Sequence, residues 1–154
     1  MHNLIVHYCH GVTAPRLDDQ LCFALYSASR AVTAAYRPLL AELNLTYPQY
    51  LVLLVLWEEG RTTVGRLCER LHLDSGTLSP LLKRLESIGY VTRERSTDDE
   101  RRVEIALTTA GPRLQAKASC IPERLTALSQ MSPEQLVSLR DTVLRLTDTV
   151  LENN

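Results

Sequence analysis

The sequence has little of several features that mark particular classes of protein. Its 154 residues carry a net charge of −1, so the chain lacks the strong positive charge that coats nucleic acid without selectivity. No apolar run approaches the roughly 20 residues that a membrane-spanning helix needs. No basic segment followed by a hydrophobic stretch marks a secretory signal. We therefore expect a cytoplasmic protein with no membrane partner.

Cysteine and aromatic residues are also scarce. The four cysteines are widely separated and form no Cys-x-x-Cys pair, so free thiols are the natural expectation. His7, Cys9 and His10 have no matching ligand motif further along the chain, and we expect neither a metal nor a cofactor. Aromatic residues make up only 5% of a chain that is 45% hydrophobic and rich in leucine, which favours one domain with an aliphatic, helical core.

Apolar residues recur at helical spacing through most of the chain. Residues 1–16 show no such period and are expected to form a tail. Asp18 is the predicted N-cap of a first long helix, and Thr46 the N-cap of a second, nearly all apolar helix that stops at Gly60. The predicted helices lie at about 18–43, 46–60, 62–74, 74–89, 110–128 and 132–150.

The hydrophobic period changes after Gly89. The segments "YVTRERS" and "RRVEIALT" alternate apolar and polar side chains and are separated by charged residues, which is typical of a β-hairpin. Two short helices followed by a hairpin form a winged helix-turn-helix. We therefore predict a mainly α fold with one small hairpin.

The helix predicted within 74–89 has the pattern of a DNA-reading helix. Leucines occupy the face to be buried, while the opposite face carries short hydroxyl groups, a proline and two cations that suit base edges and phosphates. The predicted DNA contacts on this helix are Ser75, Thr77, Ser79, Pro80, Lys83 and Arg84. An ordinary capped amphipathic helix is the alternative, and the adjacent hairpin decides against it.

The tip of the hairpin supplies a second predicted DNA contact. Asp99 precedes Arg101 by two residues, and in a tight loop its carboxylate can hold the guanidinium extended for entry into a narrow minor groove. A solvated charged turn is the alternative. Residues 61–102 hold nine Lys and Arg against seven Asp and Glu, a local charge of +2 that agrees with a nucleic-acid partner.

The last predicted helix carries an apolar seam. Its members alternate at steps of three and four residues, which is the spacing of a helix that packs against another helix. The seam consists of Leu136, Leu139, Val143, Leu146 and Val150. Burial within the same chain would also satisfy this pattern, but we expect self-association.

The stretch "LDSGTLSPLLKRLESIGYVTRERSTDDERRVEIALTTAG" resembles the DNA-binding lobe of the MarR family of regulators. The wing signature of that family is present as Asp99, Arg101, Leu107 and Thr108. The resemblance implies a homodimer on palindromic double-stranded DNA. It divides a single domain, 17–154, into a winged helix-turn-helix lobe at 46–109 and dimerisation helices at 17–45 and 110–154.

The segments "QLCFALYSASR", "YRPLL" and "LTYPQYL" resemble the OhrR subfamily, whose members sense organic hydroperoxides. The likeness runs from about residue 17 to the C-terminus. It implies that Cys22 is a sensing thiolate and that Tyr36 and Tyr47 donate hydrogen bonds to it across the dimer interface. Tyr26 and Phe23 lie near Cys22 in the sequence and are expected beside it.

Elementary chemistry agrees that Cys22 needs help to become reactive. Only a few per cent of a free cysteine is thiolate at neutral pH. The helix dipole helps modestly, but Asp18 and Asp19 oppose it. Tyr36 follows Cys22 by fourteen residues, or about 21 Å along a straight helix, so it cannot reach the cysteine of its own chain. In an antiparallel dimer it can reach the cysteine of the partner.

Oxidation by a hydroperoxide would convert Cys22 to a sulfenic acid. Some OhrR members resolve this acid with a second cysteine, which by alignment falls at 126–131, where this chain has none. A mixed disulfide with a low-molecular-weight thiol is therefore expected, with Cys120 as the alternative resolving thiol. Cys68 lies on a face to be buried and is expected to be structural.

Two other functions remain open at this point. The chain could be a MarR-type repressor that a small phenolic ligand releases from DNA, with Cys22 inert. It could also be a cysteine-based peroxidase, although such an enzyme would not need the lobe at 75–102. We expect a DNA-binding repressor rather than an enzyme.

Overall fold

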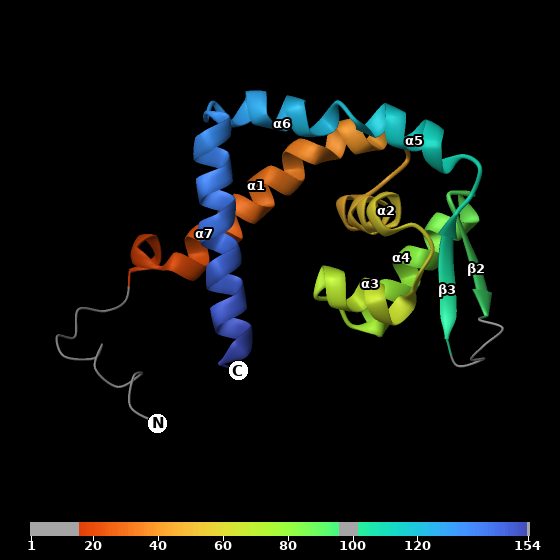
Figure 1. Ribbon diagram of the computed structural model, residues 1–154. Helices are drawn as coiled ribbons and strands as arrows, with labels where there is room; N and C mark the ends of the chain where they lie inside the picture. Colours follow the sequence, from red (N-terminus) through yellow and green to blue (C-terminus); the bar gives the residue numbers. More distant parts are fainter. Residues whose placement is uncertain (1–15, 96–101, 154) are drawn as a thin grey trace. The chain divides into compact units, whose positions relative to one another are not determined.

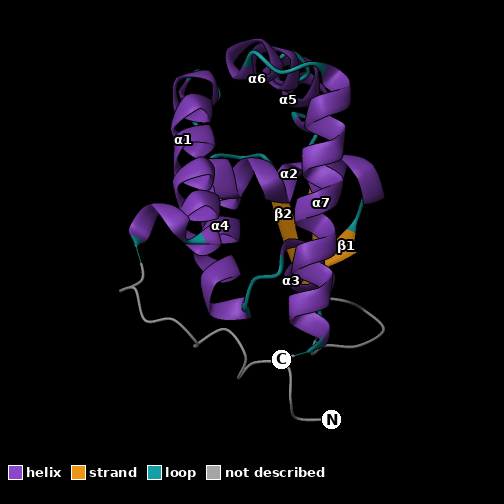
Figure 2. Cartoon of the chain, turned by 90° about the vertical axis from the view of Figure 1, so that its left-hand side faces the viewer, coloured by secondary structure: helices purple, strands orange, loops and turns teal. Residues whose placement is uncertain are grey.

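The computed structural model describes residues 16–95 and 102–153, which are mainly helical with one small antiparallel sheet (Figures 1 and 2). The described residues fall into two compact units, and the boundary follows Ala34, inside α1. The elements are η2 (Leu17–Asp19, a 3-10 helix), α1 (Leu21–Ala41), α2 (Tyr47–Glu59), β1 (Thr62–Thr63), α3 (Val64–Leu71), α4 (Ser75–Ser87), β2 (Val91–Arg95), β3 (Val103–Leu107), α5 (Gly111–Ala118), α6 (Ile121–Ser129) and α7 (Pro133–Glu152).

The helix α2 is the centre of the second unit, as its apolar composition predicted. Its first turn is fixed by the backbone N–H of Thr46, which donates to Gln49 Oε1 at 2.9 Å, and by a proline at the start of the helix. Gly60 ends the helix with a φ of +76°, a conformation that favours glycine. Apolar side chains are buried on several faces of α2: Tyr50, Val52, Leu53, Val55 and Leu56.

The predicted helix-turn-helix is formed by α3 and α4. Thr63 caps α3 by accepting from the backbone N–H of Arg66, and His72 ends α3 in the left-handed conformation. Leu67 of α3 is buried, and α4 buries Leu78, Leu82 and Leu85 against the same core. Burying three leucines on one side leaves the opposite face of α4 to solvent.

The predicted hairpin is confirmed. Strands β2 and β3 pair in an antiparallel register that runs from Val91↔Leu107 to Arg95↔Val103. The sequence did not predict β1, a two-residue strand that pairs with β3 and completes the sheet in the order β1-β3-β2. Because β1 lies directly between α2 and α3, the sheet is joined to the helix-turn-helix by the chain itself.

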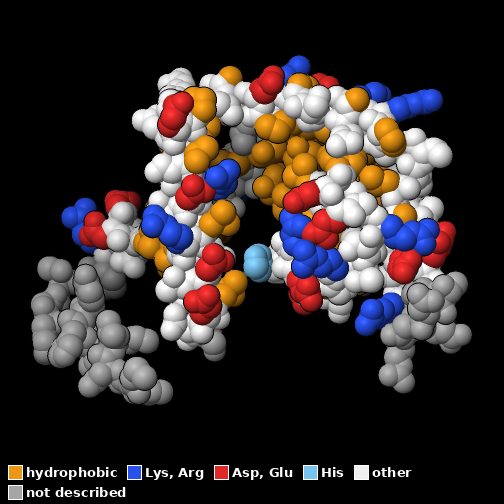
Figure 3. Space-filling view, viewed as in Figure 1, with side chains coloured by type: hydrophobic (Ala, Val, Ile, Leu, Met, Phe, Trp, Pro, Cys, Tyr) orange, Lys and Arg blue, Asp and Glu red, His pale blue; other side chains and the backbone are white. Residues whose placement is uncertain are grey.

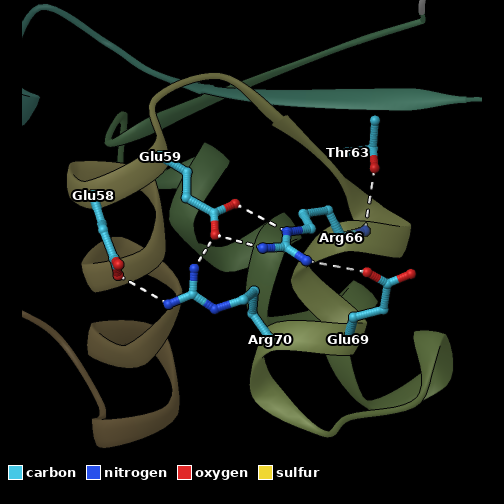
Figure 4. A network of polar contacts seen from close by, with 6 residues as sticks. All are labelled: Glu58, Glu59, Thr63, Arg66, Glu69 and Arg70. Atoms are coloured by element: carbon cyan, nitrogen blue, oxygen red, sulfur yellow. Dashed lines mark hydrogen bonds and ion pairs between the residues drawn. The ribbon is translucent and has the colours of Figure 1, made fainter.

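A cluster of ion pairs ties α3 to the end of α2 (Figure 4). Glu59 accepts from Arg66 Nε at 3.2 Å and Nη2 at 3.0 Å, and it also binds Arg70. Arg70 reaches Glu58 as well, at 2.9 Å. Exposed ion pairs contribute little one at a time, but a network that shares one carboxylate restrains both helices together.

Two predicted helix boundaries are wrong. Asp18 does not cap α1, because residues 17–19 form a separate 3-10 turn and α1 begins at Leu21. The helix predicted over 110–128 is two helices, α5 and α6, that meet at Ser119 and Cys120. Pro122 starts α6; its ring and missing N–H would break a continuous helix but suit a new first turn.

The last helix, α7, begins where it was predicted. Ser132 accepts from the backbone N–H of Gln135 at 3.3 Å, which completes a capping box. None of the described residues of α7 is buried, and Leu139 and Val150 of the predicted seam are 51% and 52% exposed. The described part of the chain therefore leaves these two positions of the seam open, while Leu136, Val143 and Leu146 are half-buried. Within the described residues, no helix is long and apolar enough to cross a membrane.

Candidate functional site

The exposed face of α4 carries most of the side chains that the sequence predicted to meet DNA. Ser75, Thr77, Pro80, Lys83 and Arg84 are exposed, and only Ser79 is half-buried. Among the described residues, neither of the two cations forms an ion pair. The face therefore combines free positive charge, short polar groups and the N-terminus of a helix.

Two hydroxyl groups of this face are already hydrogen-bonded within the helix. Thr77 donates its hydroxyl to Asp74 Oδ2 at 2.7 Å and its backbone N–H to Asp74 Oδ1 at 2.8 Å. These bonds hold the pKa of Asp74 below its ordinary value. Ser79 donates to the backbone oxygen of Ser75 at 2.7 Å. The Thr77 methyl group, the Ser79 lone pairs and the hydroxyl of Ser75 are what remains for contact with a base.

A surface hollow of about 650 Å³ lies where α3, the first turn of α4 and the hairpin meet. Ser75, Ser79, Arg93 and Arg102 line it, together with half-buried Cys68. Arg93 also forms an ion pair with Glu86 of α4 at 3.8 Å, so β2 is tied to the helix. The predicted wing contacts Asp99 and Arg101 lie outside the described residues.

A group of aromatic rings joins the second half of α1 to α2. The Tyr36 ring centroid lies 4.8 Å from that of Tyr47 and 5.9 Å from that of Tyr50, and Tyr50 lies 6.1 Å from Trp57. In Figure 3 hydrophobic side chains gather over α2, beneath α5 and α6. The two tyrosines singled out in the sequence are therefore neighbours, although eleven residues separate them.

The surroundings keep these tyrosines protonated. Burial raises the pKa of Tyr36 to about 12, with smaller contributions from Tyr47 and Tyr50. Burial also raises the pKa of Tyr47 and, together with Tyr47, that of Tyr50. A phenol that stays neutral is a hydrogen-bond donor. No bond from the hydroxyl of Tyr36 or Tyr47 is found within the described residues, so both can donate to an anion.

Cys22 lies in the first turn of α1 and is exposed, so within one chain it is not a buried residue of the hydrophobic core. Phe23 is half-buried, while Tyr26 is 56% exposed. The hydroxyl of Tyr26 accepts from Arg30 Nη1 at 2.8 Å, and the guanidinium carbon lies 5.5 Å from the ring centroid. Tyr26 is thus engaged with Arg30. Cys22 belongs to the first unit and the tyrosine group to the second.

Cys120 is the N-cap of α6 and is exposed. Its Sγ lies 3.7 Å from the backbone oxygen of Lys117, and it lines a hollow of about 270 Å³ with Lys117 and Arg124. No disulfide joins the described cysteines. Among these residues, no cluster of His, Cys, Asp and Glu could hold a metal ion.

Two residues of the site, Tyr50 and Arg61, escaped the analysis of the sequence. Tyr50 follows Tyr47 at helical spacing, so the aromatic content of α2 was a usable signal. Arg61 binds carboxylates of both hairpin strands, Glu94 and Glu104. No local pattern marks Arg61, because its partners are 33 and 43 residues away.

Comparison with known proteins agrees with this geometry. The family model of the transcriptional regulators SarA and Rot matches residues 34–117. The organic hydroperoxide resistance transcriptional regulator of Bacillus subtilis is 50% identical over 139 residues, which cover 90% of this chain and 95% of that protein. The regulator TtmR of Methylorubrum extorquens is 51% identical over 132 residues, 86% of this chain and 68% of that protein.

Solved structures give the same result. Reduced AbfR bound to DNA superposes with a TM-score of 0.72 at 36% identity and covers 87% of this chain and 94% of that one. A disulfide form of AbfR superposes with a TM-score of 0.60 at 41% identity, covering 86% and 93% of the two chains. The fold and the exposed face of α4 thus define a winged helix-turn-helix transcriptional regulator. The chain belongs to the MarR family, in the OhrR subfamily of organic hydroperoxide resistance regulators.

Proposed function

We propose that this chain is a DNA-binding repressor that senses organic hydroperoxides through Cys22 and then releases its operator. The observation that carries the proposal is the pair Tyr36 and Tyr47, two neighbouring phenols that stay protonated and have free donor hydroxyls. In a homodimer these donors serve the Cys22 of the partner subunit, because fourteen residues of helix separate Tyr36 from its own Cys22.

The sensing step is the attack of the Cys22 thiolate on the terminal oxygen of a hydroperoxide. A sulfur–oxygen bond forms, the oxygen–oxygen bond breaks, and the alcohol leaves after taking one proton. Sulfur loses two electrons and the hydroperoxide gains them. The sulfenic acid then condenses with a low-molecular-weight thiol to give a mixed disulfide and water. Apolar side chains expected around Cys22 in the dimer, Phe23 and Leu25 among them, would favour organic hydroperoxides over hydrogen peroxide.

Release of DNA follows from the symmetry of the dimer. Two copies of α4 must reach two half-sites one helical turn apart at the same time. Oxidation removes the anion that the tyrosines bind, and a mixed disulfide adds bulk at the interface that holds the two lobes. A shift of a few ångströms between the recognition helices is enough to prevent simultaneous binding.

The test is release from DNA by one equivalent of cumene hydroperoxide. We expect wild type to lose its complex with a duplex selected from a random pool, and Cys22→Ser to keep it. Cys68→Ser is the matched control and should respond as wild type does. If the wild-type complex ignores the hydroperoxide, redox sensing is wrong, while DNA binding as such remains.

Mass spectrometry of the oxidised protein separates the two fates of the sulfenic acid. With glutathione present, a single adduct on Cys22 is expected in both wild type and Cys120→Ser. A disulfide between Cys22 and Cys120 in wild type would instead assign Cys120 as the resolving thiol. Repeated consumption of hydroperoxide by a thiol reductant would identify a peroxidase, and we expect none.

A second candidate is a repressor that a small phenolic ligand releases. The observation that favours it is a hollow of about 500 Å³ between α2 and the α5–α6 segment, lined by Tyr50, Leu54 and Trp57. Trp57 Nε1 is buried and has no hydrogen-bond partner among the described residues. Quenching of Trp57 fluorescence by salicylate, with release of DNA from Cys22→Ser, would support this alternative.

A further inference from the structure

The two strands of the hairpin place like charges opposite each other. Glu94 of β2 and Glu104 of β3 are direct partners in the antiparallel register. Directly paired side chains lie on the same face of the sheet, and two carboxylates in this position repel each other. The pair is next to the last one before the tip, since only Arg95↔Val103 lies beyond it. This is where the strands would separate first.

One guanidinium binds both carboxylates. Arg61 Nη2 donates to Glu94 Oε2 at 3.1 Å, and Arg61 Nη1 donates to Glu104 Oε2 at 2.9 Å. The hydrogen bond to Glu104 and the charge of Glu94 raise the pKa of Arg61. A planar fork with parallel N–H groups suits this bridge, and a lysine could not reproduce it.

The backbone brings Arg61 to this position. It follows Gly60, whose positive φ ends α2, and it precedes β1. In β1, Thr63 pairs with Glu104 itself, and α3 starts at the next residue. Arg61 therefore lies at the junction of α2, the sheet and the helix-turn-helix.

Two neighbouring cations of the hairpin, Arg93 and Arg95, do not replace Arg61. Arg93 and Arg95 flank Glu94 in β2, so their side chains point to the opposite face of the strand. Arg93 also has its own partner, Glu86 of α4. On the described part of the Glu94 face, Arg61 lies within hydrogen-bond distance of both carboxylates.

We propose that Arg61 is a positioning residue for the wing: by binding Glu94 and Glu104 together, it keeps the distal end of the hairpin closed and fixed to the start of α3. The inference rests on the proposed DNA binding, since a wing and a recognition helix held together can meet the duplex as one surface. Arg61 acts through the strands and needs no contact with DNA.

The first test is hydrogen exchange of the free protein. We expect backbone amides of β2 and β3 to exchange about 3- to 10-fold faster in Arg61→Gln than in wild type, because Glu94 and Glu104 then face each other without the guanidinium that bridges them. Arg70→Gln is the matched control, because it also removes one positive charge that binds two carboxylates, Glu58 and Glu59. In this variant the amides of β2 and β3 should exchange as slowly as in wild type. This measurement involves no DNA and therefore stands even if the proposed function fails.

The second test is a charge-matched rescue of DNA affinity. Arg61→Gln should bind the selected duplex about 3- to 10-fold more weakly than wild type. Adding Glu104→Gln restores the net charge and removes the repulsion, so the double variant should recover most of the affinity. Adding Glu69→Gln to Arg61→Gln restores the same charge on α3 but leaves Glu94 facing Glu104, and it should not recover.

Three outcomes would overturn the proposal. One is an Arg61→Gln hairpin that exchanges as slowly as wild type. Another is an equal recovery of DNA affinity when Glu69→Gln or Glu104→Gln is added, which would show that only the net charge of the protein matters. The third is a full rescue by Arg61→Lys, which would show that the two-armed geometry is irrelevant. A wild-type protein that binds no selected duplex would instead contradict the proposed function and leave the exchange result intact.

Discussion

The free cations on α4 lead to a prediction about salt. Lys83 is exposed next to Leu82, which is fully buried, and it forms no ion pair with another described residue. No carboxylate in the described lobe competes for it, so a DNA phosphate is its expected partner. Lys83→Gln removes the charge and keeps a polar side chain, and because the side chain is exposed the fold should not change.

The magnitude follows from counterion release. Each phosphate that a protein neutralises contributes a slope of about −0.9 to the dependence of log K on log salt. A homodimer presents Lys83 twice, so Lys83→Gln should make the slope less steep by about 1.8. The affinity should fall by the same factor for specific and non-specific duplexes, because a phosphate contact carries no base information.

Fluorescence anisotropy over roughly 50 to 200 mM KCl measures this slope. The matched control is Lys117→Gln, which removes an equal charge from an exposed position of α5. An unchanged slope in Lys83→Gln would refute the phosphate assignment even if the affinity fell. An equal change of slope in Lys117→Gln would show that total charge, not position, is responsible.

Four further outcomes are expected. Arg101→Ala should weaken DNA binding more than Lys83→Ala in the same anisotropy assay if the wing enters the minor groove, and equal small losses would argue against that role. Leu82→Ala should lower the free energy of unfolding by about 2–5 kcal/mol in urea titrations, because it leaves a cavity under the recognition helix. Since the pKa of Tyr36 is raised to about 12, its contribution to stability should be constant below pH 10 and fall between pH 10 and 12; Tyr36→Phe should flatten this fall, as measured by unfolding at fixed pH. Leu139→Asp should convert dimers to monomers in sedimentation experiments, because it places a charge at an exposed position of the apolar seam of α7.

Local chemistry made much of the fold predictable. Thr46, Gly60 and Ser132 mark helix ends because caps and positive-φ positions demand particular residue types, and all three lie where they were expected. The change from a helical period to strict alternation located the hairpin. These signals depend only on neighbouring residues, so tertiary contacts did not overrule them.

The misplaced elements depend on less local information. Proline is favourable in the first turn of a helix and disruptive in its middle. Pro122 was therefore compatible with a helix start, but the sequence alone did not show that α6 starts there. A two-residue strand such as β1 has no period and exists only because β3 offers an edge. Asp18 has the chemistry of an N-cap, yet the chain makes a 3-10 turn before α1.

In the candidate site, too, the features set by local sequence were predictable and those set by long-range packing were not. The face of α4 follows from helical periodicity, and five of the six residues predicted on it are exposed, while Ser79 is half-buried. That Tyr36 and Tyr47 meet, with Tyr50 behind them, depends on how α1 packs on α2. The hydrogen bond from Thr77 to Asp74 was also missed. A threonine hydroxyl can bond either to the N-cap residue of its own helix or to a DNA base, and the sequence does not distinguish the two.

The helix α2 has a mechanical consequence. It begins at Tyr47 and ends at Glu58, Glu59 and the Gly60–Arg61 junction, where ion pairs anchor α3 and the hairpin. Thirteen residues make a stiff lever of about 20 Å, so a tilt of about 5° at the phenol end moves the far end by nearly 2 Å. In the proposed mechanism, an oxygen atom or thiol added to the partner's Cys22 at the phenol end would be converted into a larger displacement of the far end of α2.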